Sequence, residues 1–339
     1  MKARMWTPAC GESLCRISQE GAEGSPGPSV PHCGGRRTMA GSLAMSPPFP
    51  APARTALPVP LLRAAVAVLV MAVALATAGL LTAWLGGGRS VVDRLLPAAL
   101  VSVVVVPAIL VLRLRWDRSR LSGIGLTDLR TSVNSLLLGA GVVSGCGAVI
   151  VAAVSLTGGI SWTGFDPLEF MTFLAVNTAI ALLLEALPEE LSIRGYALTA
   201  LRSRCSRGVA ALLATAAFLA LPPIALGLQA LLSGLTGSAP LPSLAPAGEE
   251  PLTYYAMLAG FSMLLIFARE ATVSASIWTC IGAHLAFLTV NRILLGAGAT
   301  GVELEVAGPA LAVTLPLYLC TAVVAFSLLR ERADRRRAQ

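Results

Sequence analysis

The stretch LLRAAVAVLVMAVALATAGLLTAWLG, residues 61–86, decides the fold class of this chain. Arg63 is its only charged residue, and nearly all the other side chains are apolar. A helix needs about 20 apolar residues to cross a hydrocarbon core of about 30 Å, so this run is long enough to span a membrane. Lipid offers backbone groups no hydrogen-bond partner, and the run is therefore expected to be helical.

Similar apolar runs follow along the rest of the chain. The sequence has 339 residues, of which 55% are hydrophobic and 13% charged, about half the charged share of a typical soluble protein. No soluble core could bury so much apolar surface. The sequence predicts an all-α, polytopic membrane bundle of about eight transmembrane helices, at approximately 61–86, 91–112, 133–157, 168–187, 209–232, 252–268, 272–295 and 308–329.

The formal charge of +7 comes mainly from arginines at the ends of these runs. They follow the second, fourth and eighth runs, whereas the connections 158–167, 233–251 and 296–307 contain no Lys or Arg. The positive-inside rule then predicts a multi-pass protein of the cell membrane with both termini in the cytoplasm. Only the connection 87–94, with Arg89 and Arg94, opposes this orientation. The same distribution argues against a nucleic-acid partner.

The stretch Glu185-Ala-Leu-Pro-Glu-Glu-Leu-Ser-Ile-Arg-Gly195 carries the most informative chemistry. Pro188 fits the first position of a new helical turn, which would place Glu189 and Glu190 where the helix dipole favours carboxylates. Glu190 and Arg194 are four residues apart and can pair, whereas Glu189 points about 100° away and stays free for a water or a substrate. One held and one free carboxylate suit general base catalysis.

A structural interpretation of this stretch is also open. Acidic residues in a first helical turn commonly cap the helix, and the arginine can anchor it at the membrane interface. Ionisable groups beside a long apolar run are costly, however, and they usually serve a function. This context favours the functional interpretation.

His284 is the only histidine in the apolar part of the chain, since the other is His32. A lone histidine in an apolar helix is often a hydrogen-bonded structural group, and this alternative stays open. A zinc site built on two or three histidines does not fit this sequence. The seven cysteines include no C-x-x-C pair. We therefore expect neither a metal nor another cofactor.

Two segments resemble motifs of the CPBP family, which comprises CAAX prenyl endopeptidases and bacteriocin-processing or immunity proteins. They are Pro188-Glu-Glu-Leu-Ser-Ile-Arg-Gly195 and Ser276-Ile-Trp-Thr-Cys-Ile-Gly-Ala-His284, and the resemblance covers roughly residues 165–295. It implies an intramembrane endopeptidase in which Glu189 activates water, Glu190 and Arg194 support it, and His284 stabilises the oxyanion. The implied substrate is a membrane-anchored peptide or protein.

Two positions depart from the family pattern. The segment Phe218-Leu-Ala-Leu-Pro222 has a proline where the family's F-x-x-x-H motif has a histidine, and proline cannot take a proton. Leu288 stands where an asparagine follows the later histidine. Asn291, two turns after His284 on the same helical face, is the candidate substitute. Gln229, seven residues after Pro222, cannot act as a base at neutral pH.

These departures leave a second hypothesis open, a non-catalytic relative that keeps the fold and binds a partner protein or peptide. Paired catalytic groups act as a unit, so the loss of one can remove most of the activity. A small-solute transporter is a third hypothesis. It is disfavoured because the two halves of the chain show no repeated broken helices.

The chain divides into four parts on these grounds. Residues 1–57 form a Pro-, Gly- and Ser-rich leader, expected to be disordered or to precede a true start at Met39 or Met45. Residues 58–160 hold the N-terminal transmembrane helices, and residues 161–296 hold the core with the family motifs. Residues 297–339 hold the last transmembrane helix and a basic tail.

Overall fold

The structure is a computed structural model that describes residues 58–85, 90–235, 250–296 and 300–339. The predicted leader at 1–57 lies outside these residues. Within them the chain is mostly helical, and eight helical stretches are long and apolar enough to cross a membrane. The predicted number and type of spans are confirmed, and the chain is a multi-pass membrane protein.

The first three spans lie close to their predicted positions. They are α1 (Pro58–Trp84), α2 (Val91–Val111) with η1 (Leu112–Trp116), and η2 (Leu121–Ile124) followed by α3 (Leu129–Leu156). Side-chain caps begin two of these helices. Ser90 and Asp93 form a reciprocal capping box at α2, and the Asp128 carboxylate accepts the Thr131 amide at α3.

The fourth span differs most from its prediction. It is continuous from Pro167 to Arg202, whereas the sequence predicted an end near residue 187. It consists of α4 (Pro167–Ala181), η3 (Leu182–Ala186), α5 (Leu187–Glu189), η4 (Glu190–Ala197) and α6 (Leu198–Arg202), in which both η segments are π-helical. A stretch of 36 residues measures about 54 Å as an α-helix, more than the thickness of a hydrocarbon core.

The remaining spans are α7 (Arg207–Leu235), α8 (Pro251–Glu270), α9 (Ile277–Leu294) and α10 (Gly308–Ala338). Two short strands, β1 (Ile160–Phe165) and β2 (Val302–Val306), pair antiparallel and link the connection before α4 to the connection before α10. This small sheet is the one element beyond the predicted all-helical architecture in the described part of the chain.

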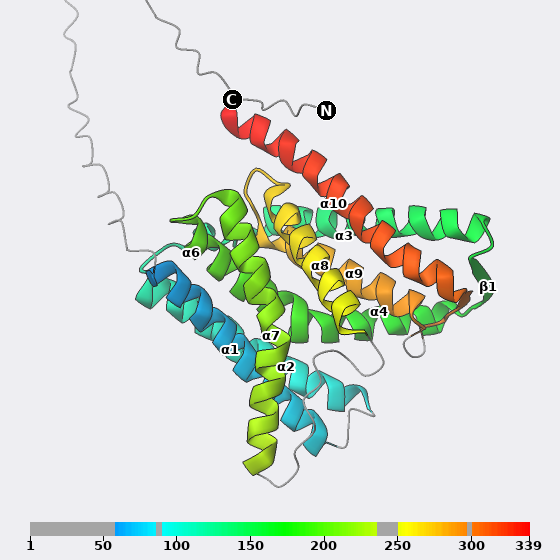
Figure 1. Cartoon of the computed structure of the whole chain (residues 1–339), viewed down its shortest axis with the longest axis horizontal. Coiled ribbons are helices and arrows are strands. Elements are labelled where there is room, and N and C mark those ends of the chain that lie inside the picture. The colour runs from blue at the N-terminus through cyan, green and yellow to red at the C-terminus, as the bar shows by residue number, and fades with distance from the viewer. Residues whose placement is uncertain (1–57, 86–89, 236–249, 297–299) are drawn as a thin grey trace, which may run out of the picture. The chain divides into compact units, whose positions relative to one another are not determined.

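Small residues allow the helices to approach closely. α1 packs on α2 and α7 through a face that includes Ala67, Ala74 and Ala78, all buried. α9 lies between α3 and α8 (Figure 1), and glycines at its contact with α3 bring the two backbones together. Large apolar side chains such as Leu156 and Leu168 are exposed, as expected for surfaces that face lipid.

Candidate active site

The predicted motif lies inside a continuous helix, not at the start of a new one. Residues on both sides of Pro188 have right-handed helical dihedral angles, so the expectation of a helix N-terminus at this proline is wrong. The helix accommodates the proline by widening, since the Leu187 N–H bonds to the Leu182 carbonyl, five residues back. The glutamates therefore receive no stabilisation from free amides of a first turn.

The widened turns release carbonyl groups, and side chains from other helices bind two of them. The Ser102 hydroxyl of α2 donates to the Leu183 carbonyl oxygen at 2.5 Å. Further along, the Leu198 N–H bonds to Ile193 instead of Arg194, and the Arg269 guanidinium of α8 donates to the Arg194 carbonyl. These bonds hold the π-helical stretch in place, because buried polar groups need partners.

Glu190 is the centre of a buried charged cluster. Its Oε1 lies 3.3 Å from Arg194 Nη1 and 3.0 Å from His284 Nδ1. Glu190 and Arg194 are fully buried, and His284 is 1% exposed. The predicted Glu190–Arg194 pair is thus confirmed, and the structure adds His284 of α9 as its third member.

Aromatic rings enclose this cluster. The Arg194 guanidinium lies over the Phe218 ring, 4.1 Å from its centroid, and Phe261 contacts the His284 ring edge-on at 4.8 Å between centroids. Even so, Glu190 Oε2 and Arg194 Nε and Nη2 are buried without a hydrogen-bond partner among the described residues. Buried polar atoms in this state commonly bind water or a ligand.

Glu189 is next to the cluster in the chain but does not belong to it. Its side chain is 9% exposed, and its carboxylate makes no hydrogen bond or ion pair within the part of the chain that the structure describes. The family resemblance implies that Glu189 activates water and that His284 stabilises the oxyanion of the same reaction. The described contact of His284, however, is with Glu190. One turn before Glu189, Glu185 lies 3.7 Å from Arg292 of α9.

The positions connected with the departures from the family pattern lie on α7 and α9. Pro222 is half-buried in the interior of α7. The Gln229 amide lies against Gly79 of α1, where an added Cβ would come within 2.5 Å of Gln229 Oε1. Asn291 is half-buried, and its Oδ1 has no hydrogen-bond partner among the described residues. Its role as a substitute stays a prediction.

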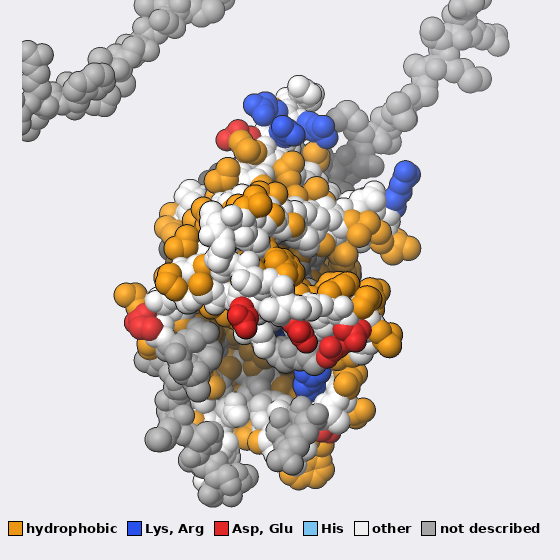
Figure 2. Space-filling view, turned by 90° about the vertical axis from the view of Figure 1, so that its right-hand side faces the viewer, with side chains coloured by type: hydrophobic (Ala, Val, Ile, Leu, Met, Phe, Trp, Pro, Cys, Tyr) orange, Lys and Arg blue, Asp and Glu red, His pale blue; other side chains and the backbone are white. Residues whose placement is uncertain are grey.

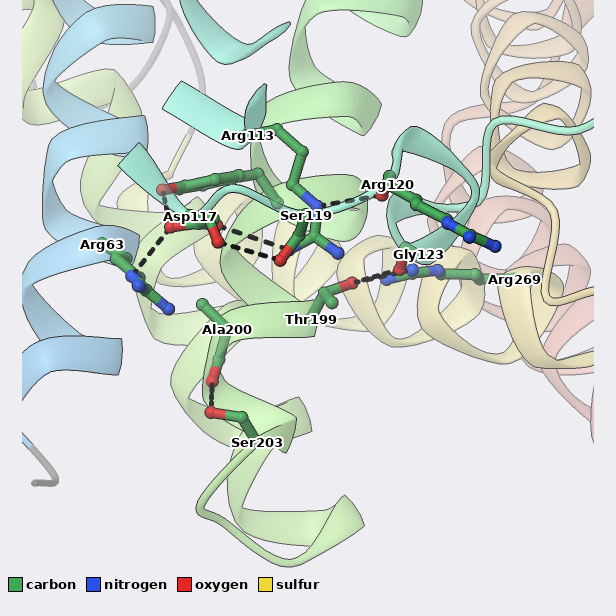
Figure 3. Close-up of polar contacts among 11 residues, drawn as sticks. Arg63, Arg113, Asp117, Ser119, Arg120, Gly123, Thr199, Ala200, Ser203 and Arg269 are labelled. Carbon is green, nitrogen blue, oxygen red and sulfur yellow. Dashed lines mark hydrogen bonds and ion pairs between the residues drawn. The ribbon is translucent and has the colours of Figure 1, made fainter. Parts of the chain in front are cut away.

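Sequence reasoning missed a second polar cluster that holds the other end of η4. Asp117 accepts bonds from Arg63 of α1 at 3.0 Å, from Arg113 at 3.4 Å and from the Tyr196 hydroxyl at 3.3 Å. Beside it, Thr199 receives a bond from Arg269 and donates to the Gly123 carbonyl (Figure 3). The arginines at 113–120 indicated which side of the membrane this connection faces. They did not indicate that three side chains bind Asp117, because that depends on how α1 and η4 pack.

Arg269 links the two clusters, because it binds both the Arg194 carbonyl and the Thr199 hydroxyl. Arg269 is 4% exposed and supports the backbone of the π-helical stretch, whereas its neighbour Glu270 pairs with Arg202 and Arg330. Among the described residues no three His, Cys, Asp or Glu side chains lie close enough together to hold a metal ion.

A protein-family model matches the part of the chain that holds this cluster. The family model described as type II CAAX prenyl endopeptidase Rce1-like matches residues 171–290. The match contains both motifs and every member of the Glu190 cluster. Searches of curated proteins and of solved structures gave no significant match.

Proposed function

Since residues 171–290 form a domain of the Rce1-like CAAX prenyl endopeptidase family within a multi-pass membrane protein, we propose that the chain is an intramembrane endopeptidase. Its substrate would be a membrane-associated peptide or protein. The observation that carries the proposal is the buried Glu190–Arg194–His284 cluster, with unsatisfied polar atoms, directly beside the unpaired Glu189. Ionisable groups at such positions in a membrane protein are costly and usually functional.

In the proposed reaction the Glu189 carboxylate takes a proton from water, and the resulting hydroxide adds to the carbonyl carbon of the scissile bond. The proton then passes to the leaving amine nitrogen as the C–N bond breaks. His284 would stabilise the oxyanion through Nε2–H. With Nδ1 donating to Glu190, donation from Nε2 uses a ring that carries a proton on both nitrogens.

The proposal includes no metal. Only His284 is available as an imidazole ligand beyond residue 57, and Glu190 and Arg194 already pair with each other. Structural and catalytic zinc sites generally use three or four His, Cys or carboxylate ligands. Cleavage that stops on addition of a chelator and returns with zinc would contradict this part of the proposal.

Replacement of Glu189 by glutamine keeps the size of the side chain but removes the base. We expect cleavage of a lipid-anchored peptide by the purified protein in detergent to fall by about 10²–10⁴-fold. Glu185→Gln is the matched control, because Glu185 lies one turn earlier in the same helix and pairs with Arg292. The control should stay within a few-fold of the original protein. Equal cleavage by the Glu189→Gln and unsubstituted proteins would contradict the role of Glu189.

A second candidate function is binding of a partner protein or peptide without catalysis. It is favoured by Pro222, which supplies no proton acceptor, and by the aromatic enclosure of His284. In this case neither the unsubstituted protein nor Glu189→Gln would cleave the peptide, and a partner would co-purify equally with both. Loss of the partner in Glu189→Gln would count against this candidate.

We further propose that both termini lie in the cytoplasm. Arg207 pairs with Asp334 at 3.0 Å and Arg330 with Glu270 at 2.7 Å, so the connection after the fourth span and the basic tail meet at one end of the bundle. Basic clusters of this kind mark the cytoplasmic side. A green fluorescent protein fused after Gln339 in bacteria should fluoresce, whereas an alkaline phosphatase fused there should be inactive. The opposite result would reverse the orientation.

A further inference from the structure

A cavity of about 790 Å³ lies between α1, α2, α4 and α9, and the Glu190 cluster does not line it. It is lined at one end by the beginnings of α2 and α4 and the end of α9. Figure 2 looks at this end of the molecule, where acidic side chains cross the face and a basic side chain lies below them beside a hollow. The lining residues that carry the argument are Arg94, Arg292, Asn177, Glu169, Thr82 and Thr172.

Two arginines give this cavity its binding chemistry. Arg94, in the first turns of α2, is exposed and makes no hydrogen bond or ion pair within the described ranges. Arg292 contacts the Oδ1 of the buried Asn177, and its side chain is 31% exposed. Glu169 is the acidic residue of the lining, and Glu185, which lies outside the lining, pairs with Arg292, so the positive charge without a carboxylate partner among the described residues is that of Arg94. An anionic group would be attracted here.

The uncharged polar side chains of the lining already make hydrogen bonds within the protein. The Asn177 amide donates to Thr289 and accepts from Arg292. The hydroxyls of Thr82 and Thr172 donate to carbonyls four residues earlier in their own helices. A peptide bound along the cavity would therefore find few partners for its backbone groups. The Arg94 guanidinium, by contrast, has no hydrogen-bond partner among the described residues.

The rest of the wall is apolar and suits a hydrocarbon chain. Leu75, Pro97, Phe173, Ile180 and Leu184 line the cavity from three helices. A volume of about 790 Å³ is within the range of pockets that enclose a small-molecule ligand. Arginine binds phosphate groups through charge-assisted hydrogen bonds, and the head group of an anionic phospholipid carries such a phosphate.

We propose that this cavity binds an anionic phospholipid, with its phosphate at Arg94 and Arg292 and an acyl chain along the apolar wall. The inference does not depend on peptidase activity, because it uses none of the groups assigned to catalysis. The proposal gives a binding role to Arg94, one of the two arginines in the connection 87–94 that do not fit the positive-inside rule.

The test measures lipid retained on the protein. The full chain is placed in nanodiscs of equal parts phosphatidylglycerol and phosphatidylcholine and then released for native mass spectrometry. We expect bound phosphatidylglycerol on the unsubstituted protein and about tenfold weaker binding in Arg94→Gln, which loses a charge-assisted hydrogen bond. The matched control is Arg332→Gln, the same charge change at an exposed arginine of the tail, which should retain the lipid fully.

Phe173→Trp provides a second variant that narrows the apolar wall and leaves both arginines in place, and it should also lose the lipid. Equal retention in Arg94→Gln and Arg332→Gln would overturn the proposal, as would equal binding of phosphatidylcholine. A third arm adds inorganic phosphate alone. If phosphate displaces the lipid or raises the melting temperature as much as phosphatidylglycerol does, the cavity is a simple anion site and the lipid assignment fails.

Discussion

Glu190→Ala is expected to destabilise the protein by about 3–5 kcal/mol, because it leaves the Arg194 guanidinium buried without its carboxylate partner. The arginine is fully buried and lies over Phe218, so it cannot reach water without displacing packed helices. His284 would lose its partner as well. The effect should appear as a large fall in melting temperature of the purified protein in detergent.

A double variant separates the loss of the pair from the loss of packing volume. Glu190→Leu combined with Arg194→Met removes both charges and keeps apolar bulk, and buried ion pairs replaced in this way are often neutral for stability. We expect it to recover most of the melting temperature while remaining inactive. If Glu190→Ala alone melts like the original protein, the cluster is not a buried ion pair.

Gly139→Ala is expected to destabilise the protein by about 2–3 kcal/mol, because overpacking costs of this size arise where neighbours cannot move. An added Cβ at Gly139 of α3 would lie 2.0 Å from the Thr279 carbonyl oxygen of α9, and at Gly282 it would lie 2.0 Å from the Leu136 carbonyl oxygen. Both obstacles are backbone atoms. The two helices would have to separate, which would displace His284, two residues after Gly282.

Gly141→Ala is the matched control in the same helix, since a Cβ there meets nothing within 4 Å. Alanine has a higher helix propensity than glycine by about 1 kcal/mol, so this variant should be neutral or slightly more stable. The two substitutions are chemically identical, but only Gly139→Ala should lower the melting temperature. A similar shift for both would show that α3 and α9 do not pack through Gly139.

The sequence predicted the Glu190–Arg194 pair but not the contact of this pair with His284. Glu190 and Arg194 pair as their spacing indicated, because both belong to one helix and the interaction is local. The contact between His284 and Glu190 was not predicted. It joins residues 94 positions apart on two different spans, so their spacing in the sequence could not indicate it.

The glycine-rich third span shows the same limit. Its sequence does not distinguish Gly139, which contacts α9, from Gly141 and Gly145, which face open space. Likewise, the arginines within and after η1 indicated topology, whereas the convergence of Arg63, Arg113 and Tyr196 on Asp117 depends on three separate segments.

The sequence alone determined that this chain forms about eight membrane-crossing helices. Lipid contains no water to bind backbone groups, so each apolar run that is long enough to cross the membrane must be a helix. It also determined the local Glu190–Arg194 pair and the family motifs. Only the tertiary structure decided which carboxylate holds His284, which side chains bind the carbonyls freed by the widened turns, and where two arginines line a cavity. Those contacts join distant segments, and their geometry follows from how the helices pack.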